Sequence, residues 1–203
     1  MGEVLLKAEK IDKHFGITHA LDHVSITFNK GEIHALIGEN GSGKSTLTSC
    51  LTGIYKKDSG TFILDGKEVS AANQVDGNHQ GVAIIVQEIG TLSGLTVAEN
   101  IFLGNEDQFT KFGIKNTAAM NKKAQEYLDS YGFNYIDAAK TIDDYNFEDR
   151  KLIEIVKSTY FNPKILVVDE TTTALGQKGR EELFKVMHKM RDMGSCVIFI
   201  SHD

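Results

Sequence analysis

The sequence has no long apolar run and no secretory leader at its start, and both absences restrict where the protein works. No apolar stretch approaches the roughly 18 residues that a membrane-spanning helix requires. The opening residues, Met1-Gly2-Glu3, lack the basic and apolar regions of a signal peptide. We therefore expect a cytosolic chain, or a peripheral one held by a partner on the cytoplasmic side of the cell membrane.

The sequence is also poor in cysteine and has no excess of positive charge. Cys50 and Cys196 are isolated in apolar surroundings, so we expect buried, reduced thiols and neither a disulfide nor a metal site. The net charge of −6, from 22 basic and 28 acidic residues, argues against broad electrostatic binding to nucleic acid. Most histidines show no metal-ligand spacing, and we expect them to be surface or hydrogen-bonded polar residues. They are His14, His19, His23, His34, His79 and His188.

One octapeptide carries the most specific signal in the chain. Gly38-Glu39-Asn40-Gly41-Ser42-Gly43-Lys44-Ser45 fits the pattern G-x-x-x-x-G-K-[ST] and directly follows an apolar run at residues 33–37. In such a loop Gly41 and Gly43 let the backbone turn its N–H groups toward phosphate oxygens. Lys44 then reaches the β- and γ-phosphates, and Ser45 offers its hydroxyl to Mg²⁺. The sequence therefore predicts binding of a nucleoside triphosphate.

Three further apolar runs of strand character end in polar side chains. They are residues 82–86 before Gln87, residues 165–168 before Asp169 and Glu170, and residues 197–200 before Ser201 and His202. Open α/β sheets bind their ligands just past the carboxyl ends of their strands. The pair Asp169 and Glu170 has the form of a Mg²⁺-orienting aspartate followed by a water-polarising glutamate. Polar residues at the ends of four expected strands are a more specific sign of a nucleotide-binding site than the loop alone.

The rest of the pattern divides the chain into a core and a helical insertion. With 203 residues the chain is long enough for one domain, or for one domain with a subdomain. Residues 4–11, 22–29 and 61–65 predict a small antiparallel sheet beside the loop. A helix is expected from Lys44 to about Leu51, with Gly53 as its end signal. The stretch 96–160 has a mostly helical pattern, and Pro163 marks the return to the core. We assign residues 1–90 and 161–203 to the core and residues 91–160 to a helical subdomain.

In this order, and with this insertion, the motifs resemble the ATP-binding cassette of ABC transporters over nearly the whole chain. Residues 34–47, HALIGENGSGKSTL, and residues 95–104, LTVAENIFLG, are similar to the amino-terminal cassette of bacterial monosaccharide importers of the ribose/galactose type. The resemblance implies an α/β fold, a P-loop NTPase core with an antiparallel β subdomain and an inserted helical subdomain. It also implies ATP and Mg²⁺ as ligands. The implied partners are a second cassette in tandem, a transmembrane permease and, indirectly, a periplasmic or extracellular sugar-binding protein.

The resemblance also assigns roles to single residues. Phe15 stands where the family has an aromatic that stacks on adenine, with a core phenylalanine as the alternative. Gln87 would bind Mg²⁺ and sense the permease through the loop after it, unless it is only a solvent-facing strand end. Asp169 would orient Mg²⁺, directly or through water, and Glu170 would polarise the attacking water. His202 would contact the γ-phosphate, although a lone histidine at a strand end is more often structural. The nucleotide contacts expected in the loop are Gly38, Glu39, Asn40, Gly41, Ser42, Gly43, Lys44, Ser45 and Thr46.

The chain departs from the family at its signature, Leu-Ser-Gly-Gly-Gln or a near relative. Residues 145–151 read YNFEDRK instead. Asn146 can still cap a helix, but Glu148 replaces the small residue that lets the backbone approach the other cassette's γ-phosphate. Glu148 and Asp149 would weaken closure around a triphosphate, and they would also suit a helix amino terminus. Thr171 stands where the family has proline, and the chain stops at Asp203, so we expect a fragment of a longer protein.

Three functions are compatible with these residues. The leading one is an ATPase module that powers uptake of a monosaccharide or a related small solute by driving a permease. The second is a cytosolic ABC ATPase that acts as an ATP-driven clamp or regulator without transport. The third is a fragment that binds nucleotide without appreciable turnover, because the ABC site needs two cassettes.

Overall fold

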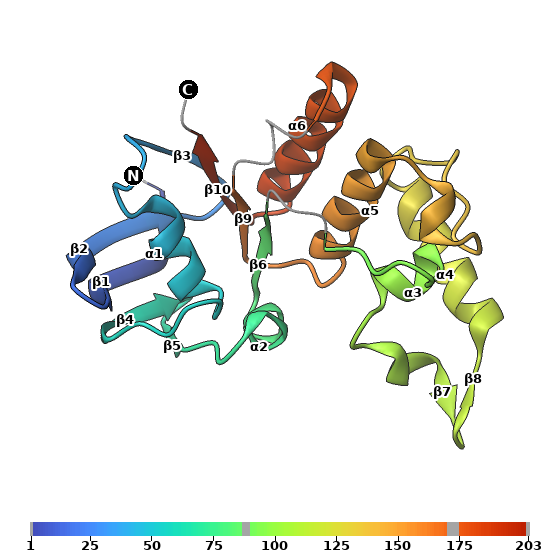
Figure 1. Cartoon of the computed structure of the whole chain (residues 1–203), viewed down its shortest axis with the longest axis horizontal. Helices are drawn as coiled ribbons and strands as arrows, with labels where there is room; N and C mark the ends of the chain where they lie inside the picture. The colour runs from blue at the N-terminus through green and yellow to red at the C-terminus, as the bar shows by residue number, and fades with distance from the viewer. Residues whose placement is uncertain (1, 87–89, 170–174, 202–203) are drawn as a thin grey trace. The chain divides into compact units, whose positions relative to one another are not determined.

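The computed structural model describes residues 2–86, 90–169 and 175–201, and the chain forms two compact units. The first unit comprises Met1–Val86, Phe161–Thr171 and Met187–Asp203, and the second comprises Gln87–Tyr160 and Thr172–Val186. Figure 1 shows the elements of each unit. The sequence-based division assigns residues 161–203 to the core, whereas residues 175–186 group with the helical unit in the structure.

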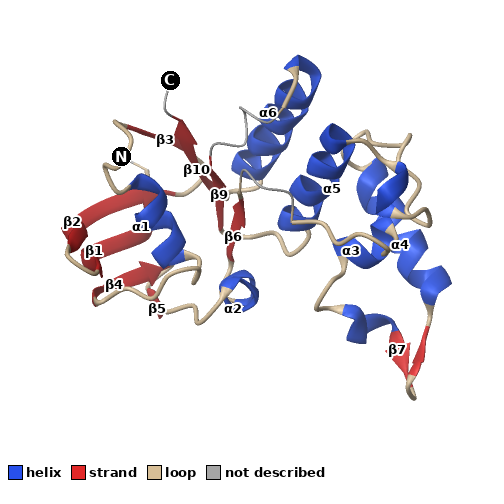
Figure 2. Ribbon diagram, viewed as in Figure 1, coloured by secondary structure: helices blue, strands red, loops and turns tan. Residues whose placement is uncertain are grey.

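The first unit contains an antiparallel sheet and a parallel sheet (Figure 2). The antiparallel sheet has the order β2-β1-β4-β5, and the parallel sheet has the order β3-β10-β9-β6. The antiparallel strands are β1 Val4–Phe15, β2 Thr18–Asn29, β4 Ser59–Leu64 and β5 Lys67–Val69. The parallel strands are β3 Ile33–Ile37, β6 Val82–Ile85, β9 Ile165–Asp169 and β10 Cys196–Ser201. Because all four strands of the second sheet are parallel, their carboxyl ends share one edge.

Two short helices complete the first unit, α1 Lys44–Leu51 and α2 Gln74–His79. One cluster of buried apolar side chains joins α1 to both sheets, with Leu47 and Leu51 from the helix, Phe62 from β4 and Ile198 from β10 among its members. The helix ends as predicted, since Gly53 follows its last turn with a φ of 80°. Packing α1 against both sheets fixes the direction of its first turn.

The second unit is mainly helical. Its α-helices are α3 Val97–Ile101, α4 Thr117–Asp129, α5 Phe147–Thr159 and the first part of α6 Gln177–Asp192. Short 3-10 helices lie at Glu106–Phe109 and Ile142–Asp144, and β7 Thr110–Lys111 pairs with β8 Ile114–Lys115. Fully buried Ile101, Met120, Leu128 and Ile153 contribute to its core. Among the described residues, none of the helices combines the length and the apolar character needed to cross a bilayer.

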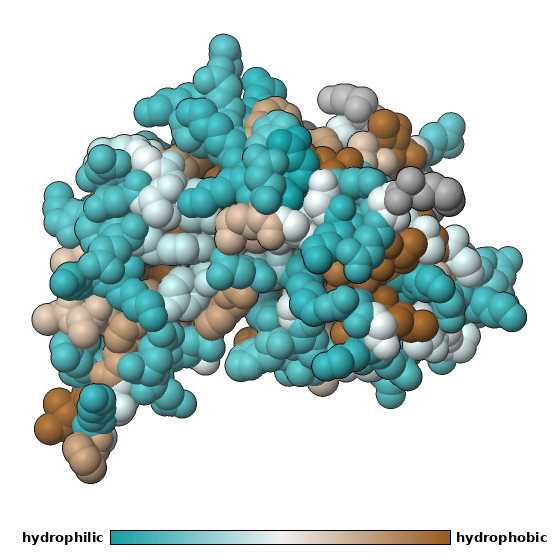
Figure 3. All heavy atoms as spheres, turned by 180° about the vertical axis from the view of Figure 1, so that it is seen from behind, coloured by the Kyte–Doolittle hydropathy of each residue, from teal (hydrophilic) through white to brown (hydrophobic). Residues whose placement is uncertain are grey.

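The hairpin β7–β8 was not expected from the sequence. Its tip carries Phe112, which is fully exposed, and Ile114, which is 75% exposed. The tip stands out as an apolar point at the lower left of the space-filling view in Figure 3. Two-residue strands give almost no alternation of apolar and polar side chains, so no pattern in the sequence marks them.

Candidate nucleotide-binding site

Residues 38–43 connect β3 to α1, and Gly43 takes the position before the first helical turn. Its φ of 88° lies in the left-handed region that glycine adopts without strain. A Cβ at Gly43 would lie 2.8 Å from the carbonyl oxygen of Ala20 and 2.9 Å from Cδ2 of Leu21. Glycine is therefore required twice over here, by conformation and by the close approach of the loop to β2.

The amino terminus of α1 differs from those of α2, α3, α4 and α5. The helices α2, α3, α4 and α5 are each capped by a side chain, from Asn73, Thr96, Asn116 and Asn146 respectively. The start of α1 has no side-chain cap and no acidic residue in its first turn. The first N–H groups of a helix have no partner within it and carry a partial positive charge. In α1 no side chain competes with an anion for these groups.

Lys44 brings a full positive charge to the same loop. Its ammonium group donates to the carbonyl oxygens of Gly38, at 2.8 Å, and Glu39, at 2.9 Å, and to Oγ of Ser42, at 3.2 Å. These bonds hold the ammonium over the loop. The loop therefore offers a charged donor and a helix amino terminus together, the combination that binds phosphate.

Ser45 and Asp169 meet across the sheet edge. Oγ of Ser45 donates to Oδ1 of Asp169 at 3.2 Å, although 124 positions separate them in the sequence. A hydroxyl and a carboxylate oxygen this close are the hard ligands that Mg²⁺ prefers. The residues present at this edge therefore fit a magnesium ion, and the assignment of both side chains to Mg²⁺ stays a prediction.

Phe15, at the end of β1, is not a core residue. Its ring is 41% exposed, packs edge-on against Tyr55 at 5.1 Å between centroids, and lies 5.2 Å from Nζ of Lys13. The residue belongs to the same hairpin as Ala20, which touches the loop at Gly43. The partial exposure is compatible with stacking on a flat ligand, and this role of Phe15 stays a prediction.

Three predicted site residues, Gln87, Glu170 and His202, lie outside the described residues. The strands that precede them, β6, β9 and β10, run parallel and end at the edge that carries the loop and Asp169. The other expected loop contacts differ in exposure. Glu39, Asn40 and Ser42 are exposed, and Thr46 is partly buried in the first turn of α1.

The departure from the family signature has a clear structural basis at the start of α5. The side chain of Asn146 accepts from the N–H of Asp149 at 2.9 Å and caps the helix, as predicted. Oε1 of Glu148 accepts from the N–H of Gly179 at 2.9 Å, in the first turn of α6. Oδ1 of Asp149 accepts from the hydroxyl of Tyr135 at 3.0 Å. Both carboxylates are thus used within the second unit.

A buried ion pair lies on the next turn of α5. Lys151 is fully buried, and its ammonium donates to Oε2 of Glu154 at 3.0 Å. Burial lowers the pKa of Lys151, and Glu154 opposes this shift. The same Oε2 accepts from the N–H of Gly90 at 3.2 Å. Glu154 therefore ties the helix that begins at the signature to the segment three residues after Gln87.

Glu154→Ala is expected to destabilise the protein by about 3–5 kcal/mol, because it removes the carboxylate that pairs with a buried ammonium. Glu182→Ala is the matched control, since Glu182 and Lys185 form another i,i+3 pair, at 2.8 Å, with the lysine 70% exposed. The control is expected to lose less than about 1 kcal/mol. Urea unfolding of both variants measures the difference, and equal losses would show that burial of the Lys151 pair has no energetic consequence.

The comparisons with known proteins agree with this geometry. The sequence model of the ABC transporter family matches residues 21–173. The chain belongs to the ABC transporter family. Among solved structures, a nucleotide-free ATP-binding cassette from an ABC transporter superposes with a TM-score of 0.80 at 27% identity, over 98% of this chain and 81% of that one. An ABC transporter cassette in its ADP conformation gives 0.80 at 29% identity, with the same coverage. The predicted family and fold class are confirmed.

Within the ABC transporter family, the chain is similar in sequence to ATP-binding proteins of sugar transporters. A ribose import ATP-binding protein of Clostridium perfringens strain SM101 is 40% identical over 204 residues, which is 100% of this chain and 40% of the relative. A galactofuranose transporter ATP-binding protein of Escherichia coli strain K12 is 36% identical over 198 residues, 98% of this chain and 39% of the relative. The chain therefore spans about two-fifths of the length of these relatives. The predicted resemblance to sugar-importer cassettes is confirmed.

Proposed function

We propose that the chain is the ATP-binding and ATP-hydrolysing part of an importer for a monosaccharide or a related small solute. The observation that carries this proposal is the uncapped amino terminus of α1, placed directly after a loop that holds the Lys44 ammonium. The relatives are import and transporter ATP-binding proteins of a sugar-importing group. Because the chain covers only part of their length, the second cassette and the permease are part of the proposal.

In this proposal the triphosphate binds at the loop. The N–H groups of the first turn of α1 and the Lys44 ammonium bind its phosphate oxygens, and Phe15 stacks on adenine. Ser45 and Asp169 would hold Mg²⁺, together with Gln87, and the ion when bound neutralises charge on the β- and γ-phosphates. Phosphoryl transfer of this kind is catalysed by positioning and by electrostatic stabilisation more than by covalent chemistry.

Glu170 and His202 are proposed to act on the attacking water and the γ-phosphate. Glu170 directly follows Asp169, whose carboxylate meets Ser45, so its place in the chain is the place of a base beside the phosphate site. It would accept a proton from the water as the water attacks. His202 directly follows β10, the strand next to β9, and would contact the γ-phosphate.

Coupling to a permease is proposed to pass through the segment after Gln87, of which residues 90–94 are hydrogen-bonded within the second unit. Its Gly90 N–H donates to Glu154, and the Gly94 N–H donates to Asp143 at 2.8 Å. Fully buried Asn100 accepts from the Leu92 N–H at 2.7 Å and donates back to the Leu92 carbonyl at 3.1 Å. A movement of this segment caused by the permease would be transmitted to α3 through Asn100 and to α5 through Glu154. The assembled protein would then work at the cytoplasmic face of the membrane.

The alternative, an ATP-driven clamp or regulator without transport, has less support. The sugar-importer relatives match over nearly the whole of this chain and are import or transporter subunits by name. We therefore keep the importer as the proposed function.

Lys44→Ala is expected to weaken Mg-ATP binding by tenfold or more. The lost charge-assisted contact is of the kind worth roughly 1.5–3 kcal/mol, and about 1.4 kcal/mol corresponds to a factor of ten. Isothermal calorimetry of the 203-residue chain measures the affinity. Lys67→Ala, an exposed lysine on β5, is the control and should bind as the parent does. Equal affinities for Lys44→Ala and Lys67→Ala would contradict the assignment of the loop.

A further inference from the structure

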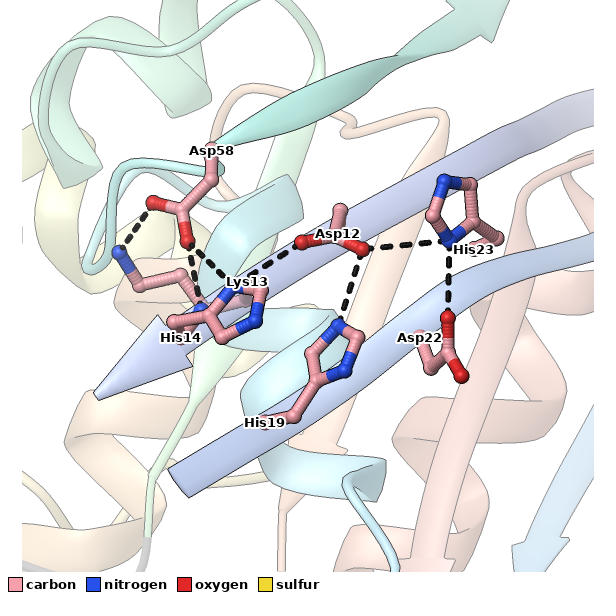
Figure 4. Close-up of polar contacts among 7 residues, drawn as sticks. All are labelled: Asp12, Lys13, His14, His19, Asp22, His23 and Asp58. Atoms are coloured by element: carbon pink, nitrogen blue, oxygen red, sulfur yellow. Dashed lines mark hydrogen bonds and ion pairs between the residues drawn. The ribbon is translucent and has the colours of Figure 1, made fainter. Parts of the chain in front are cut away.

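Three histidines of the hairpin β1–β2 gather around the carboxylate of Asp12 (Figure 4). Nδ1 of His14 lies 3.1 Å from Oδ1 of Asp12, and Nε2 of His19 lies 3.0 Å from Oδ2. Nδ1 of His23 lies 3.4 Å from the same Oδ2 and 2.8 Å from Oδ1 of Asp22. The sequence predicted surface or hydrogen-bonded histidines, and these three are partly exposed and contact carboxylates as expected. Their gathering around one carboxylate was not expected.

The hairpin register creates the cluster. His14 and His19 are directly paired across β1 and β2, and their rings stack at 3.9 Å between centroids and 10° between planes. Asp12 lies two residues before His14 on the same strand, where the register with β2 is irregular on both sides of Lys13, and its carboxylate contacts both His14 and His19. Lys13 and Phe15 contact each other instead. The cluster therefore does not use the ring of Phe15 that the nucleotide site needs.

The carboxylate of Asp12 is more buried than the histidines around it. The Asp12 side chain is only 10% exposed, whereas His14 is 48% and His19 is 36% exposed. The carboxylate thus lies beneath the two imidazoles, which reach solvent. The hydrogen bond from His19 lowers the pKa of Asp12, so the carboxylate is ionised at neutral pH and can act as a ligand.

The side-chain atoms available in the cluster indicate which metal ions it could bind. One nitrogen each from His14 and His19 and one oxygen from Asp12 lie within 4.8 Å of one another. The His14 nitrogen lies 3.1 Å from Oδ1 of Asp12 and the His19 nitrogen lies 3.0 Å from Oδ2, so both imidazoles reach the carboxylate but at different oxygens. Two imidazoles and one carboxylate suit Zn²⁺, Co²⁺ or Ni²⁺, whereas Mg²⁺ and Ca²⁺ prefer oxygen ligands.

We propose that Asp12, His14 and His19 form a binding site for one divalent transition-metal ion of the zinc class. An imidazole binds an ion that lies in its own ring plane, so one of the two stacked rings turns out of the stack when the ion binds. The protons that the imidazoles donate to the carboxylate are released to solvent, and a fourth position is left for water. A second triad, Asp12, Asp22 and His23, shares the same carboxylate. It has one imidazole in place of two, and His23 and Asp22 are 65% and 75% exposed, so it is the weaker set.

Metal at this site would cross-link the two strands of the hairpin. His14 on β1 is paired with His19 on β2, and the next pair, Phe15 and Thr18, lies at the turn of the hairpin. A bound ion would therefore stabilise the hairpin against opening. The site itself does not depend on the proposed ATPase function.

The test is a calorimetric titration of the chain with ZnCl₂ at neutral pH without nucleotide. The parent should bind one ion, and H14Q/H19Q should bind roughly 100-fold more weakly because two of three ligands are gone. The control H79Q/H188Q removes the same number of histidines from exposed positions on α2 and α6 and should bind as the parent does. No saturable binding by the parent, or equal affinities for the two double variants, would overturn the proposal and leave a metal-free hydrogen-bond cluster.

Two further measurements keep the test independent of folding defects. Without metal, thermal melting shows whether H14Q/H19Q is folded, and the single variant H14Q replaces it if it is not. With metal, ZnCl₂ should raise the Tm of the parent and of H79Q/H188Q but not that of the ligand variant. Co²⁺ should give the visible absorption bands of a nitrogen- and oxygen-ligated ion only in the proteins that keep the three ligands. The same Tm shift or spectrum in all proteins would also overturn the proposal.

Discussion

Glu170→Gln is expected to leave ATP binding intact and to slow ATP hydrolysis by roughly 100- to 10,000-fold in the full-length protein with its permease. The substitution keeps the shape of the side chain and removes the charge that accepts the proton of the attacking water, and positioned bases contribute about this much. The reason for choosing Glu170 is its place directly after Asp169, whose Oδ1 lies 3.2 Å from Oγ of Ser45 at the proposed magnesium position.

The experiment measures phosphate release and nucleotide binding in the same preparation. Glu68→Gln, an exposed glutamate on β5, is the control and should hydrolyse ATP at the parental rate. If Glu170→Gln also turned over at the parental rate, another residue would have to polarise the water. If it lost ATP binding as well, its effect would be on the site's structure and not on the chemical step.

Unequal use of the two nucleotide sites is the second large effect that we expect. In an ABC dimer each signature completes the site on the opposite phosphate loop, so Lys44 and Glu170 would work with the signature of the partner cassette. The site completed by this chain's own signature would face Glu148 and Asp149. Unit charges about 4 Å apart repel by roughly 1–4 kcal/mol between the dielectric limits of bulk water and a protein surface. That site should hold nucleotide or stay idle, whereas the site with Lys44 hydrolyses.

In the structure, the carboxylate of Glu148 has a hydrogen-bond partner in α6. Its Oε1 accepts from the Gly179 N–H in the first turn of α6, where a negative charge is favourable. A Cβ at Gly179 would lie 2.5 Å from that oxygen, so the glycine makes room for the carboxylate. Glu148 therefore takes part in the packing between α5 and α6.

Changing the phosphate-loop lysine of each cassette separately tests the asymmetry in the assembled tandem protein. Lys44→Ala should abolish ATPase activity, and the corresponding change in the partner cassette should leave a substantial part of it. Each variant serves as the control for the other, because both remove the same group from the same kind of loop. Equal losses would refute the asymmetry.

The sequence predicted the parts of the site that depend on local pattern. The apolar run before Gly38 became β3, the helix began at Lys44 and ended at Leu51, and the run before Glu170 became the parallel strand β9. These elements are marked by continuous apolar runs and by glycines, which act over a few residues. Cys50 and Cys196 are buried and free, as expected, and burial raises the pKa of their thiols to about 11 and about 12.

The contacts that the sequence did not predict join residues far apart in the chain. Glu154 reaches Gly90 over 64 positions, and Glu148 reaches Gly179 over 31. The cluster around Asp12 depends on the irregular register of β1 and β2, which shifts between Ile11 and Lys13 and again before His14. Spacing along the sequence does not reveal such pairs, because strand register and helix packing decide them. The α-helix α2 and the hairpin β7–β8 were missed because both are too short to show a period.

The most direct test of the central claim is ATP-dependent sugar uptake into vesicles that hold the assembled transporter, with Mg-ATP on the side of the cassettes. Ribose and galactofuranose are the first sugars to offer, because the relatives are named for them. We expect parental vesicles to accumulate sugar only with ATP, vesicles with Lys67→Ala to match them, and vesicles with Lys44→Ala to accumulate none above background. Uptake at the parental rate in the Lys44→Ala vesicles would contradict the claim that ATP bound at this loop powers import.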